Sequence, residues 1–410
     1  MNILLISDFF FPNIGGIEVH VLSLALYFQS IGHCPVVLTR SHPPNYSGFV
    51  LLFDKLPCYY LPFLTVFGVS LPSRRSLFKQ LSSISTKHRI DLIHLHQCFS
   101  PLSLLSCSLK KSLNVPFVFT HHSIVGFEFA SFYFMKILFR SVFSCVDRFI
   151  AVSKISSRNL KQLLPSTYNN ENISIIPAGG IDESKFFTNY NQVKTNNISI
   201  VCMLRMTKRK GARLVYSVIK SILKHYNNLN VLIVGNGPYF EQINELGGGN
   251  NVTIIEGVLH AEVPTILRSS DIFLSTSLTE AFGISILEAL SCGCTVVSTP
   301  AGILDHLSDS LLSRVFKTDC EHESIVKSLC NAIDSCMNQR NSRNNYVSSC
   351  NNLLNEFSWS FIGNSTLKVY ESCLVNKKTV IKRSQKPLLS LIVISFLLMV
   401  GICLHSLSYC

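Results

Sequence analysis

Residues 275–298 read STSLTEAFGISILEALSCGCTVVS, and this stretch decides the fold. Residues 273–276 are a short apolar strand, residues 284–290 carry apolar side chains at helical spacing, and residues 294–299 form a β-branched run typical of a buried strand. Glu280 is therefore expected at the carboxyl end of one parallel strand, and Glu288 about two turns into the next helix. Open α/β sheets bind their ligands at that end.

Two glutamates separated by seven residues resemble the E-x7-E signature of retaining glycosyltransferases, which use nucleotide sugars and have two Rossmann-like domains. Eight helical positions span roughly 12 Å, whereas the paired carboxylates of a retaining hydrolase lie about 5 to 5.5 Å apart. The two glutamates are therefore not a hydrolase pair. We expect Glu280 to bind the sugar hydroxyls of one long donor and Glu288 to bind its ribose.

The composition indicates a membrane segment. Of 410 residues, 47% are hydrophobic and only 15% are charged, which is apolar for a wholly soluble protein. Residues 388–404 contain no charge and reach the low end of the length that spans a thin bilayer such as that of the endoplasmic reticulum. The segment before this span contains the basic residues Lys377, Lys378, Lys382, Arg383 and Lys386 and no acid. The positive-inside rule then predicts residues 1–387 in the cytosol and the C-terminus in the lumen.

Charge and cysteine content narrow the function further. The net charge of +12 is spread along the chain, without a basic helix face interleaved with aromatics, so it favours anionic lipid headgroups and a diphosphate donor over nucleic acid. The fifteen cysteines follow no regular spacing and indicate reduced thiols rather than a disulfide framework. Residues 1–8 lack the basic leader of a signal peptide and are predicted to form the first strand of a sheet.

Strands alternate with helical stretches twice along the chain, which predicts two parallel, doubly wound sheets. The polar residues 189–197 separate them. We therefore expect an α/β protein of the GT-B class, in which two Rossmann-like domains face a cleft and one C-terminal transmembrane helix follows. The predicted boundaries are residues 1–188 for the acceptor-side domain, 198–375 for the nucleotide-sugar-binding domain, 376–387 for a basic juxtamembrane segment and 388–404 for the anchor.

Basic residues and glycines follow predicted strands in both domains. Arg205 and Lys210 come after the strand at residues 198–203, where fixed cations can clamp a diphosphate, although a solvated basic loop is the alternative. Gly15 and Gly16 lie between the first strand and the first helix, where they allow a ligand to approach the backbone and the helix N-terminus closely. This is not the G-x-G-x-x-G fingerprint, so a nicotinamide enzyme is disfavoured.

Four histidines lie at the ends of predicted strands in the first domain. His121 and His122 follow one strand, and His94 and His96 share one face of another. No acidic or cysteine partner stands at metal-ligand spacing, so we expect a polar lining of the cleft and no bound metal. The phenylalanine-rich residues 123–146 are a core helix or, alternatively, an amphipathic surface that dips into the bilayer and receives a lipid acceptor.

Several motifs together resemble one family, the catalytic subunits of phosphatidylinositol N-acetylglucosaminyltransferase. The matching stretches are residues 7–20 (SDFFFPNIGGIEVH), 120–123 (THHS), Arg205, 210–211 (KG), 235–238 (GNGP) and 277–282 (SLTEAF). The resemblance extends over residues 1–375 and includes the C-terminal anchor. It implies transfer of N-acetylglucosamine from UDP-GlcNAc to phosphatidylinositol, the first step of glycosylphosphatidylinositol (GPI) anchor biosynthesis. It also implies a multi-subunit complex on the cytosolic face of the endoplasmic reticulum.

Carried over position by position, the resemblance assigns a role to each motif. Glu280 and Glu288 become the donor-binding pair. Arg205 and Lys210 become the diphosphate clamp, and His122 becomes the active-site histidine, so that Glu280, His122, Arg205 and Lys210 are the expected catalytic residues. The other expected donor-binding residues are Gly15, Gly16, Gly235, Gly237, Phe282, Gly283 and Ile284. Such enzymes keep the anomeric configuration without metal or cofactor, by same-face attack assisted by the leaving phosphate.

The chain departs from the family pattern at two places. Residues 300–306 (PAGILDH) have one glycine and Asp305 where the family usually has a diglycine and a glutamate, and His121 stands where an acidic residue is usual.

Two other functions stay open. One is a related membrane enzyme with another donor or lipid, such as a mannosyltransferase acting on a dolichol-linked glycan. The other is a non-catalytic scaffold protein, against which the intact glutamates and basic residues argue.

Overall fold

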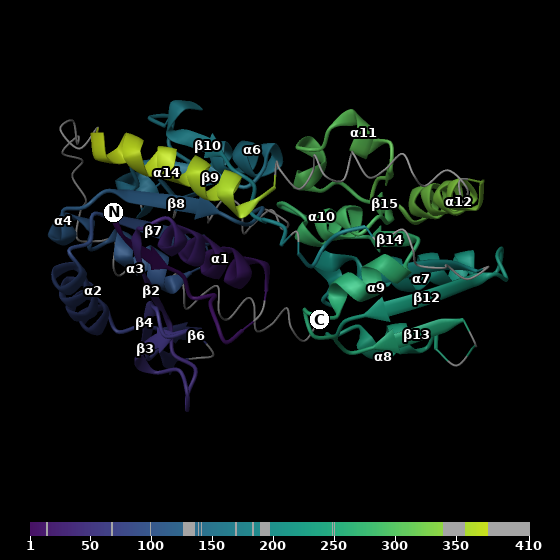
Figure 1. Ribbon diagram of the computed structural model, residues 1–410, viewed down its shortest axis with the longest axis horizontal. Helices are drawn as coiled ribbons and strands as arrows, with labels where there is room; N and C mark the ends of the chain where they lie inside the picture. The colour runs from purple at the N-terminus through teal and green to yellow at the C-terminus, as the bar shows by residue number, and fades with distance from the viewer. Residues whose placement is uncertain are drawn as a thin grey trace. The chain divides into compact units, whose positions relative to one another are not determined.

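The computed structural model describes residues 1–13, 15–66, 69–98, 100–125, 136–137, 139–140, 142–168, 170–182, 184–188, 197–247, 249, 251–338 and 357–375. The chain divides into two compact units. Unit 1 contains Met1–Gly179 and the chain from Trp359 onward, and unit 2 contains Gly180–Ser358. Each unit is built around one mainly parallel sheet (Figure 1).

The described part of unit 1 has an eight-stranded sheet in the order β10-β9-β8-β7-β1-β2-β4-β3. Its strands are β1 (Asn2–Ile6), β2 (Cys34–Arg40), β3 (Gly48–Leu52), β4 (Leu56–Leu61), β7 (Leu92–His96), β8 (Phe117–His121), β9 (Arg148–Ala151) and β10 (Ile173–Ile175). Neighbours pair in parallel except β3 and β4, and β5 (Leu64–Val66) and β6 (Val69–Leu71) form a separate antiparallel pair. Residues 3–6 of β1 are fully buried, as expected for a parallel strand covered on both faces.

Helices cover both faces of this sheet. They are α1 (Gly16–Ser30), α2 (Arg74–His88), α3 (Pro101–Cys107), α4 (Lys110–Leu113), α6 (Lys154–Leu163) and α14 (Trp359–Val375), with 3-10 turns η1 (Phe143–Cys145) and η2 (Asn170–Asn172). Successive residues of β1 point to opposite faces. Leu4 lies in one core with Leu81 of α2, and Leu5 lies in another core with Leu24 of α1. The unit is therefore doubly wound, as the sequence predicts.

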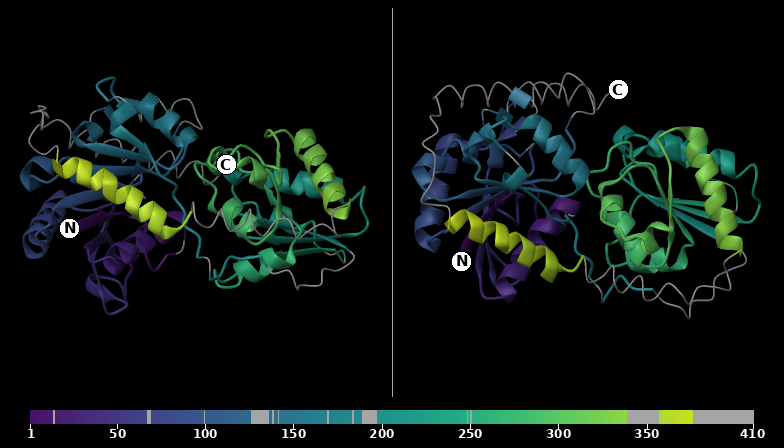
Figure 2. Two further views of the ribbon diagram at one scale, coloured as in Figure 1. Left: turned by 45° about the horizontal axis from the view of Figure 1, so that its top comes forward. Right: turned by 90° about the horizontal axis from the view of Figure 1, so that it is seen from above.

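Helix α14 packs with unit 1 although it follows unit 2 in the chain. It lies beside α1 (Figure 1; Figure 2). Gly363 permits the close approach, because a Cβ there would lie 2.1 Å from the Tyr27 ring. Ile362 and Tyr370 complete the core around Leu5. The sequence-based boundary, which placed all of residues 198–375 in the second domain, was wrong for this helix because it followed chain order.

The described part of unit 2 has a six-stranded parallel sheet in the order β13-β12-β11-β14-β15-β16. Its strands are β11 (Ile198–Met203), β12 (Leu229–Val234), β13 (Val252–Ile255), β14 (Ile272–Ser275), β15 (Thr295–Ser298) and β16 (Val315–Lys317). Its helices are α7 (Ala212–Ile222), α8 (Phe240–Asn244), α9 (Val263–Ser269), α10 (Ile284–Ser291), α11 (Asp309–Leu312) and α12 (His322–Asn338), with η3 (Lys208–Lys210) and η4 (Gly302–Asp305). The strand order reverses between β11 and β14, so the carboxyl ends of these two strands are where such a sheet binds ligands.

Several expectations concern residues outside the described ranges. The basic segment 376–387 and the anchor 388–404 both lie there, as does half of the phenylalanine-rich segment. Among the described residues of that segment, Phe139 and Phe143 are fully buried in the core, which fits a core role for those two. None of the helices in the described ranges combines the length and apolar character needed to cross a bilayer. The described cysteines are all free thiols, as predicted.

The hydrogen bond between the Tyr370 hydroxyl and His94 Nδ1, 2.6 Å long and fully buried, gives a test of how α14 is held. Tyr370→Phe should lower the free energy of unfolding of unit 1 by about 1–3 kcal/mol, because it leaves a buried imidazole nitrogen without a partner. The single tryptophan, Trp359, lies at the start of α14, so its fluorescence during urea unfolding reports on unit 1.

Tyr27→Phe is the matched control, because the Tyr27 hydroxyl donates to Asn364 Oδ1 in an exposed pair of the same unit. We expect that control to change stability by less than about 0.5 kcal/mol. Equal unfolding midpoints for the two variants would mean that the buried bond does not hold α14.

Candidate functional site

Two glycines of unit 2 let the loops after β11 and β12 touch backbone to backbone. A Cβ on Gly235 would lie 1.8 Å from the Leu204 carbonyl oxygen, and one on Gly237 would lie 2.6 Å from that of Met206. Both glycines have φ near +150°, a conformation that other residues rarely adopt. Gly235 and Gly237 therefore shape the loop that carries Arg205, whose own side chain is exposed.

The structure brings two predicted site residues together at the switch point of unit 2. Lys210 Nζ and Glu280 Oε2 lie 2.6 Å apart, although the residues are far apart in the chain. Their loops are joined by backbone contacts. Leu278 N–H donates to the Arg209 carbonyl oxygen over 2.9 Å, and Thr276 Oγ1 lies 3.2 Å from the Lys210 carbonyl oxygen. The ammonium and carboxylate thus form one charged pair beside the ends of β11 and β14.

The loop of Glu280 is also fixed from its other side, by the segment after β15. Gly302 N–H donates to the Glu280 carbonyl oxygen over 3.2 Å, and Ile303 N–H donates to that of Phe282 over 2.7 Å. Gly302 and Ile303 belong to residues 300–306, which depart from the family pattern. Despite the departure, this segment holds the Glu280 loop through backbone bonds that other sequences can also make.

Helix α10 begins directly after this loop. Gly283 precedes it with φ +100°, and Phe282 is buried beside it. The helix begins at Ile284, so Glu288 lies just over one turn into it, whereas the sequence placed Glu288 about two turns in. The first amides of a helix lack intrahelical acceptors and attract anions. Gly283 and Ile284 therefore lie where a phosphate can be bound.

Glu288 has a partner that the sequence did not reveal. His260 Nε2 lies 3.4 Å from Glu288 Oε1, and the Glu288 side chain is only 15% exposed. The hydrogen bond from His260 to Glu288 raises the pKa of the imidazole above its usual value, while burial acts in the opposite direction. No motif surrounds His260, which follows β13 in the chain, so only the fold links it to α10.

In unit 1, Gly15 and Gly16 lie at the N-terminus of α1, as predicted. Gly15 is the extended residue that caps the helix, and a Cβ there would lie 2.5 Å from Glu18 Oε2. The carboxylate of Glu18 thus occupies the space next to Gly15, at the positive end of the helix. The glycine leaves room for that carboxylate, and a donor-binding role for the loop stays a prediction.

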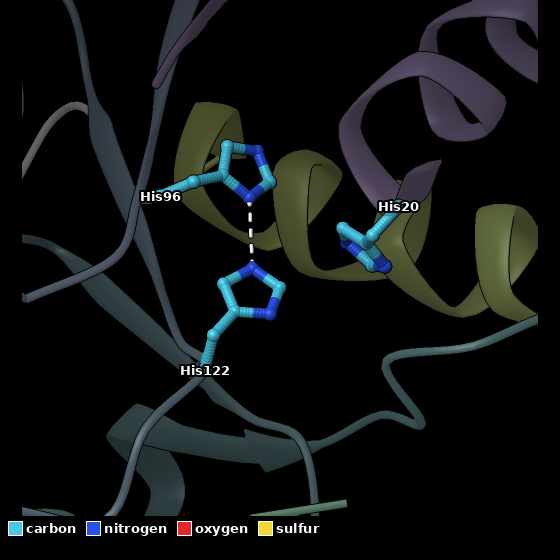
Figure 3. Close-up of side chains that lie close together, drawn as sticks. All are labelled: His20, His96 and His122. Carbon is cyan, nitrogen blue, oxygen red and sulfur yellow. Dashed lines mark hydrogen bonds between the residues drawn. The ribbon is translucent and has the colours of Figure 1, made fainter. Parts of the chain in front are cut away.

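His20, His96 and His122 of unit 1 lie together, the first two buried and His122 partly buried (Figure 3). His96 Nδ1 lies 3.1 Å from His122 Nε2, and His20, from α1, lies beside both rings. His20 Nδ1 is 2.5 Å from the Ala178 carbonyl oxygen, so it must donate a proton there. The sequence singled out His96 and His122 but missed His20, which ends the motif of residues 7–20.

Burial lowers the pKa of these imidazoles and keeps them uncharged near neutral pH. The pKa of His20 falls to about 4, and those of His96 and His122 fall well below their usual value. The His94 ring lies against that of His96, with centroids 4.0 Å apart, and its two nitrogens lie within 2.7 Å of the Tyr370 and Thr120 side-chain oxygens. His121 lies 3.2 Å from Asn159 Oδ1, and burial lowers its pKa to about 4 as well.

Three ring nitrogens of His20, His96 and His122 lie within 4.8 Å of one another, which makes them possible metal ligands. Nitrogens bound to one tetrahedral zinc at 2.0–2.1 Å lie about 3.4 Å apart. The His96–His122 contact is already an ordinary hydrogen-bond distance, and each nitrogen involved has a partner without a metal. We interpret the cluster as a hydrogen-bonded network that orients His122, and the absence of a bound metal stays a prediction.

Comparison with known proteins supports a transferase. A family model described as "Glycosyl transferases group 1" matches residues 183–349, and one described as "Glycosyltransferase Family 4" matches residues 14–184. The chain is 32% identical over 380 residues to a phosphatidylinositol N-acetylglucosaminyltransferase subunit of Homo sapiens, covering 90% of this chain and 76% of that protein. It is 33% identical over 308 residues to the corresponding protein of Arabidopsis thaliana, covering 74% and 68%. The chain belongs to this family.

Several solved structures have the same fold as this chain. One is a sucrose-phosphate synthase from Thermosynechococcus elongatus, with a TM-score of 0.72 and 18% identity over 91% of this chain and 99% of that one. Another is Anabaena HepE in complex with UDP-glucose, with a TM-score of 0.70 and 17% identity over 91% and 100%. The predicted GT-B fold with two Rossmann-like sheets is confirmed, and the chain is a glycosyltransferase.

The contact between Gly211 and Thr276 gives a test of the Lys210–Glu280 pair. Gly211 has φ +72°, and a Cβ there would lie 2.0 Å from the Thr276 carbonyl oxygen. Gly211→Ala should therefore push the two loops apart and reduce glycosyl transfer by at least about tenfold, or roughly 1.4 kcal/mol. Gly249→Ala is the control, because an added Cβ there meets no atom within 4 Å. Full activity of the Gly211 variant would contradict a role for this loop contact.

Proposed function

We propose that the protein transfers N-acetylglucosamine from UDP-GlcNAc to phosphatidylinositol with retention of configuration, the first step of GPI-anchor biosynthesis. The Lys210–Glu280 pair at the switch point of unit 2 is the observation that carries the proposal, since an open α/β sheet binds its ligand there and a nucleotide sugar would meet both a cation and a carboxylate. The relatives in Homo sapiens and Arabidopsis thaliana are named for transfer of N-acetylglucosamine and for phosphatidylinositol, which supports this sugar and this lipid acceptor.

The proposed donor lies along the loops and helix of unit 2. Its diphosphate binds the first amides of α10 and the cations Arg205 and Lys210, which stabilise negative charge as the sugar leaves. Glu280 accepts hydrogen bonds from the sugar hydroxyls. Glu288 accepts them from the ribose. Because Lys210 contacts Glu280 directly, the sugar and diphosphate ends of the donor are bound by one connected pair.

In unit 1 we assign His122 as the active-site histidine, with Gly15 and Gly16 as donor-binding residues. Partly buried and uncharged, the His122 imidazole offers a hydrogen bond without competing for the phosphate charge. Retention then follows from same-face attack assisted by the leaving phosphate, a route that needs no metal and no separate general base. The proposed chemistry uses one carboxylate, the two cations Arg205 and Lys210, and a neutral imidazole.

The proposed location is the membrane of the endoplasmic reticulum, within a multi-subunit complex. Residues 388–404 are the proposed anchor, and residues 376–387 supply basic charge for the cytosolic lipid surface. An anchored enzyme encounters its lipid acceptor at a high effective concentration.

A direct assay distinguishes this function from its two alternatives. Membranes containing the chain are incubated with labelled UDP-GlcNAc or GDP-mannose in the presence of a chelator, and the labelled lipid is identified. Label transferred from UDP-GlcNAc to phosphatidylinositol supports the proposal. Transfer from GDP-mannose identifies the related enzyme, and no transfer with intact partner subunits indicates a scaffold. Rescue of a cell that lacks the first step of anchor synthesis tests the same point in vivo.

Substitutions of the proposed donor-binding residues should reduce glycosyl transfer without unfolding the protein. Glu288→Gln and Arg205→Ala should each reduce transfer by at least about tenfold, or roughly 1.4 kcal/mol of transition-state stabilisation. Arg205 is exposed, and glutamine keeps the shape of the Glu288 side chain, so both variants should unfold at nearly the same urea concentration as the unmodified chain. Glu323→Gln, an exposed change on α12, is the control for charge loss. Retained activity in either variant would place the donor elsewhere.

The proposed topology is tested by removing residues 388–410. The shortened chain should leave the membrane fraction as a folded but poorly active enzyme, because the anchor supplies effective concentration rather than chemistry. In intact chains, protease added to sealed microsomes should digest both units. Sequons at Asn45, Asn172, Asn197, Asn251 and Asn364 should stay unmodified. A glycosidase-sensitive shift in mobility would instead place these units in the lumen.

A further inference from the structure

His260 and Glu288 come from different elements of unit 2 and meet at their side chains. His260 lies between β13 and α9, and Glu288 lies on α10, which packs against α9. The contact between His260 Nε2 and Glu288 Oε1 is 3.4 Å long. Among the described residues, Glu288 makes no other side-chain hydrogen bond or ion pair. One carboxylate oxygen therefore faces the imidazole, and the other is available to a ligand.

We propose that His260 is a positioning residue, which holds one oxygen of Glu288 so that the other accepts hydrogen bonds from the ribose of the donor. This inference rests on the proposed role of Glu288. A glutamate side chain has three rotatable bonds, and ordering it costs conformational entropy. A partner that fixes its rotamer before the donor arrives removes that cost from binding.

The imidazole is itself held by a segment at the start of unit 2. The Phe186 ring centroid lies 5.8 Å from that of His260. The charged groups near it are Glu288, Lys185 and Asp182, and the last two are paired with each other at 2.7 Å. Because Lys185 and Asp182 offset each other, Glu288 is the charge that dominates at His260.

The sign of the pH dependence follows from this environment. The hydrogen bond with Glu288 raises the pKa of His260, with burial and Lys185 opposing the shift. The charged imidazole, which binds the carboxylate most strongly, therefore persists to a higher pH than in a free histidine. As pH rises through the raised pKa, the proton is lost and the contact weakens. Donor binding should weaken over the same pH range.

The position of His260 predicts an effect on donor affinity rather than on the chemical step. His260→Ala should raise the KM for the donor about five- to tenfold, the range for losing one ordinary hydrogen bond, because solvent screens the charge of the 43% exposed imidazole. The kcat should stay within about twofold, because ribose contacts are the same in the ground state and transition state. His260→Gln, which keeps a donor group without the charge, should recover part of the loss.

The control variant is His225→Ala, an exposed histidine of unit 2 outside this contact. Steady-state kinetics are measured on the full chain in membranes between pH 5.5 and 8.5. The unmodified chain and the His225 variant should show a donor KM that rises with pH, whereas the His260→Gln variant should show a flat profile. Combining His260→Ala with Glu288→Gln should cost no more than Glu288→Gln alone, because His260 acts through the carboxylate.

A donor KM for His260→Ala equal to that of the His225 control overturns the inference, as does full additivity with Glu288→Gln. Failure of the proposed function looks different. Ribose is present in UDP-GlcNAc and in GDP-mannose alike, so the same KM comparison applies to whichever donor the unmodified chain uses. If the unmodified chain transfers neither sugar, the proposed function fails, and the Kd for UDP, compared between His260→Ala and the control, still decides the inference.

Discussion

The Lys210–Glu280 pair depends on a backbone contact between two loops that are distant in sequence. β11 and β14 are neighbours because the strand order reverses between them, so the loops at their carboxyl ends meet. Gly211 permits the approach to Thr276, since no side chain fits there. The contact fixes Lys210 and Glu280 within 2.6 Å of each other before any donor arrives. A preorganised charge pair avoids the reorganisation that two separate loops would need.

In unit 1 the equivalent constraint is the burial of polar rings. A buried imidazole is costly unless its nitrogens have partners. Tyr370 of α14 and Thr120 of β8 supply those partners to His94, and Ala178 supplies one to His20. The return of α14 to unit 1 is therefore more than apolar packing. Tyr370 also gives one ring nitrogen of His94 its partner, two residues before His96 on β7.

The sequence predicted the parts of the fold that depend on local pattern. Runs of apolar residues located the strands, and the spacing of Glu280 and Glu288 located the switch point. Both patterns lie within a short stretch of the chain, so they can be recognised without knowing the fold. The sequence did not predict that α14 packs on the sheet of unit 1. The apolar pattern of residues 359–375 indicates a helix, but it does not indicate which of the two sheets that helix covers. The sequence also missed His20 and His260. Each of these histidines matters through a contact with a distant element, and residue type alone gives no distance.

The charges on one loop explain why a diphosphate suits the switch point. Arg205, Lys208 and Arg209 are exposed on the same loop as Lys210. Glu280 offsets only Lys210, and Glu288 faces His260. The loop therefore keeps an excess of positive charge beside the N-terminus of α10, and both attract a phosphate. Under the proposed function, the two carboxylates, each held by its own partner, recognise uncharged hydroxyl groups. The cations would then bind the charged diphosphate, and the carboxylates the two polar sugars on either side of it.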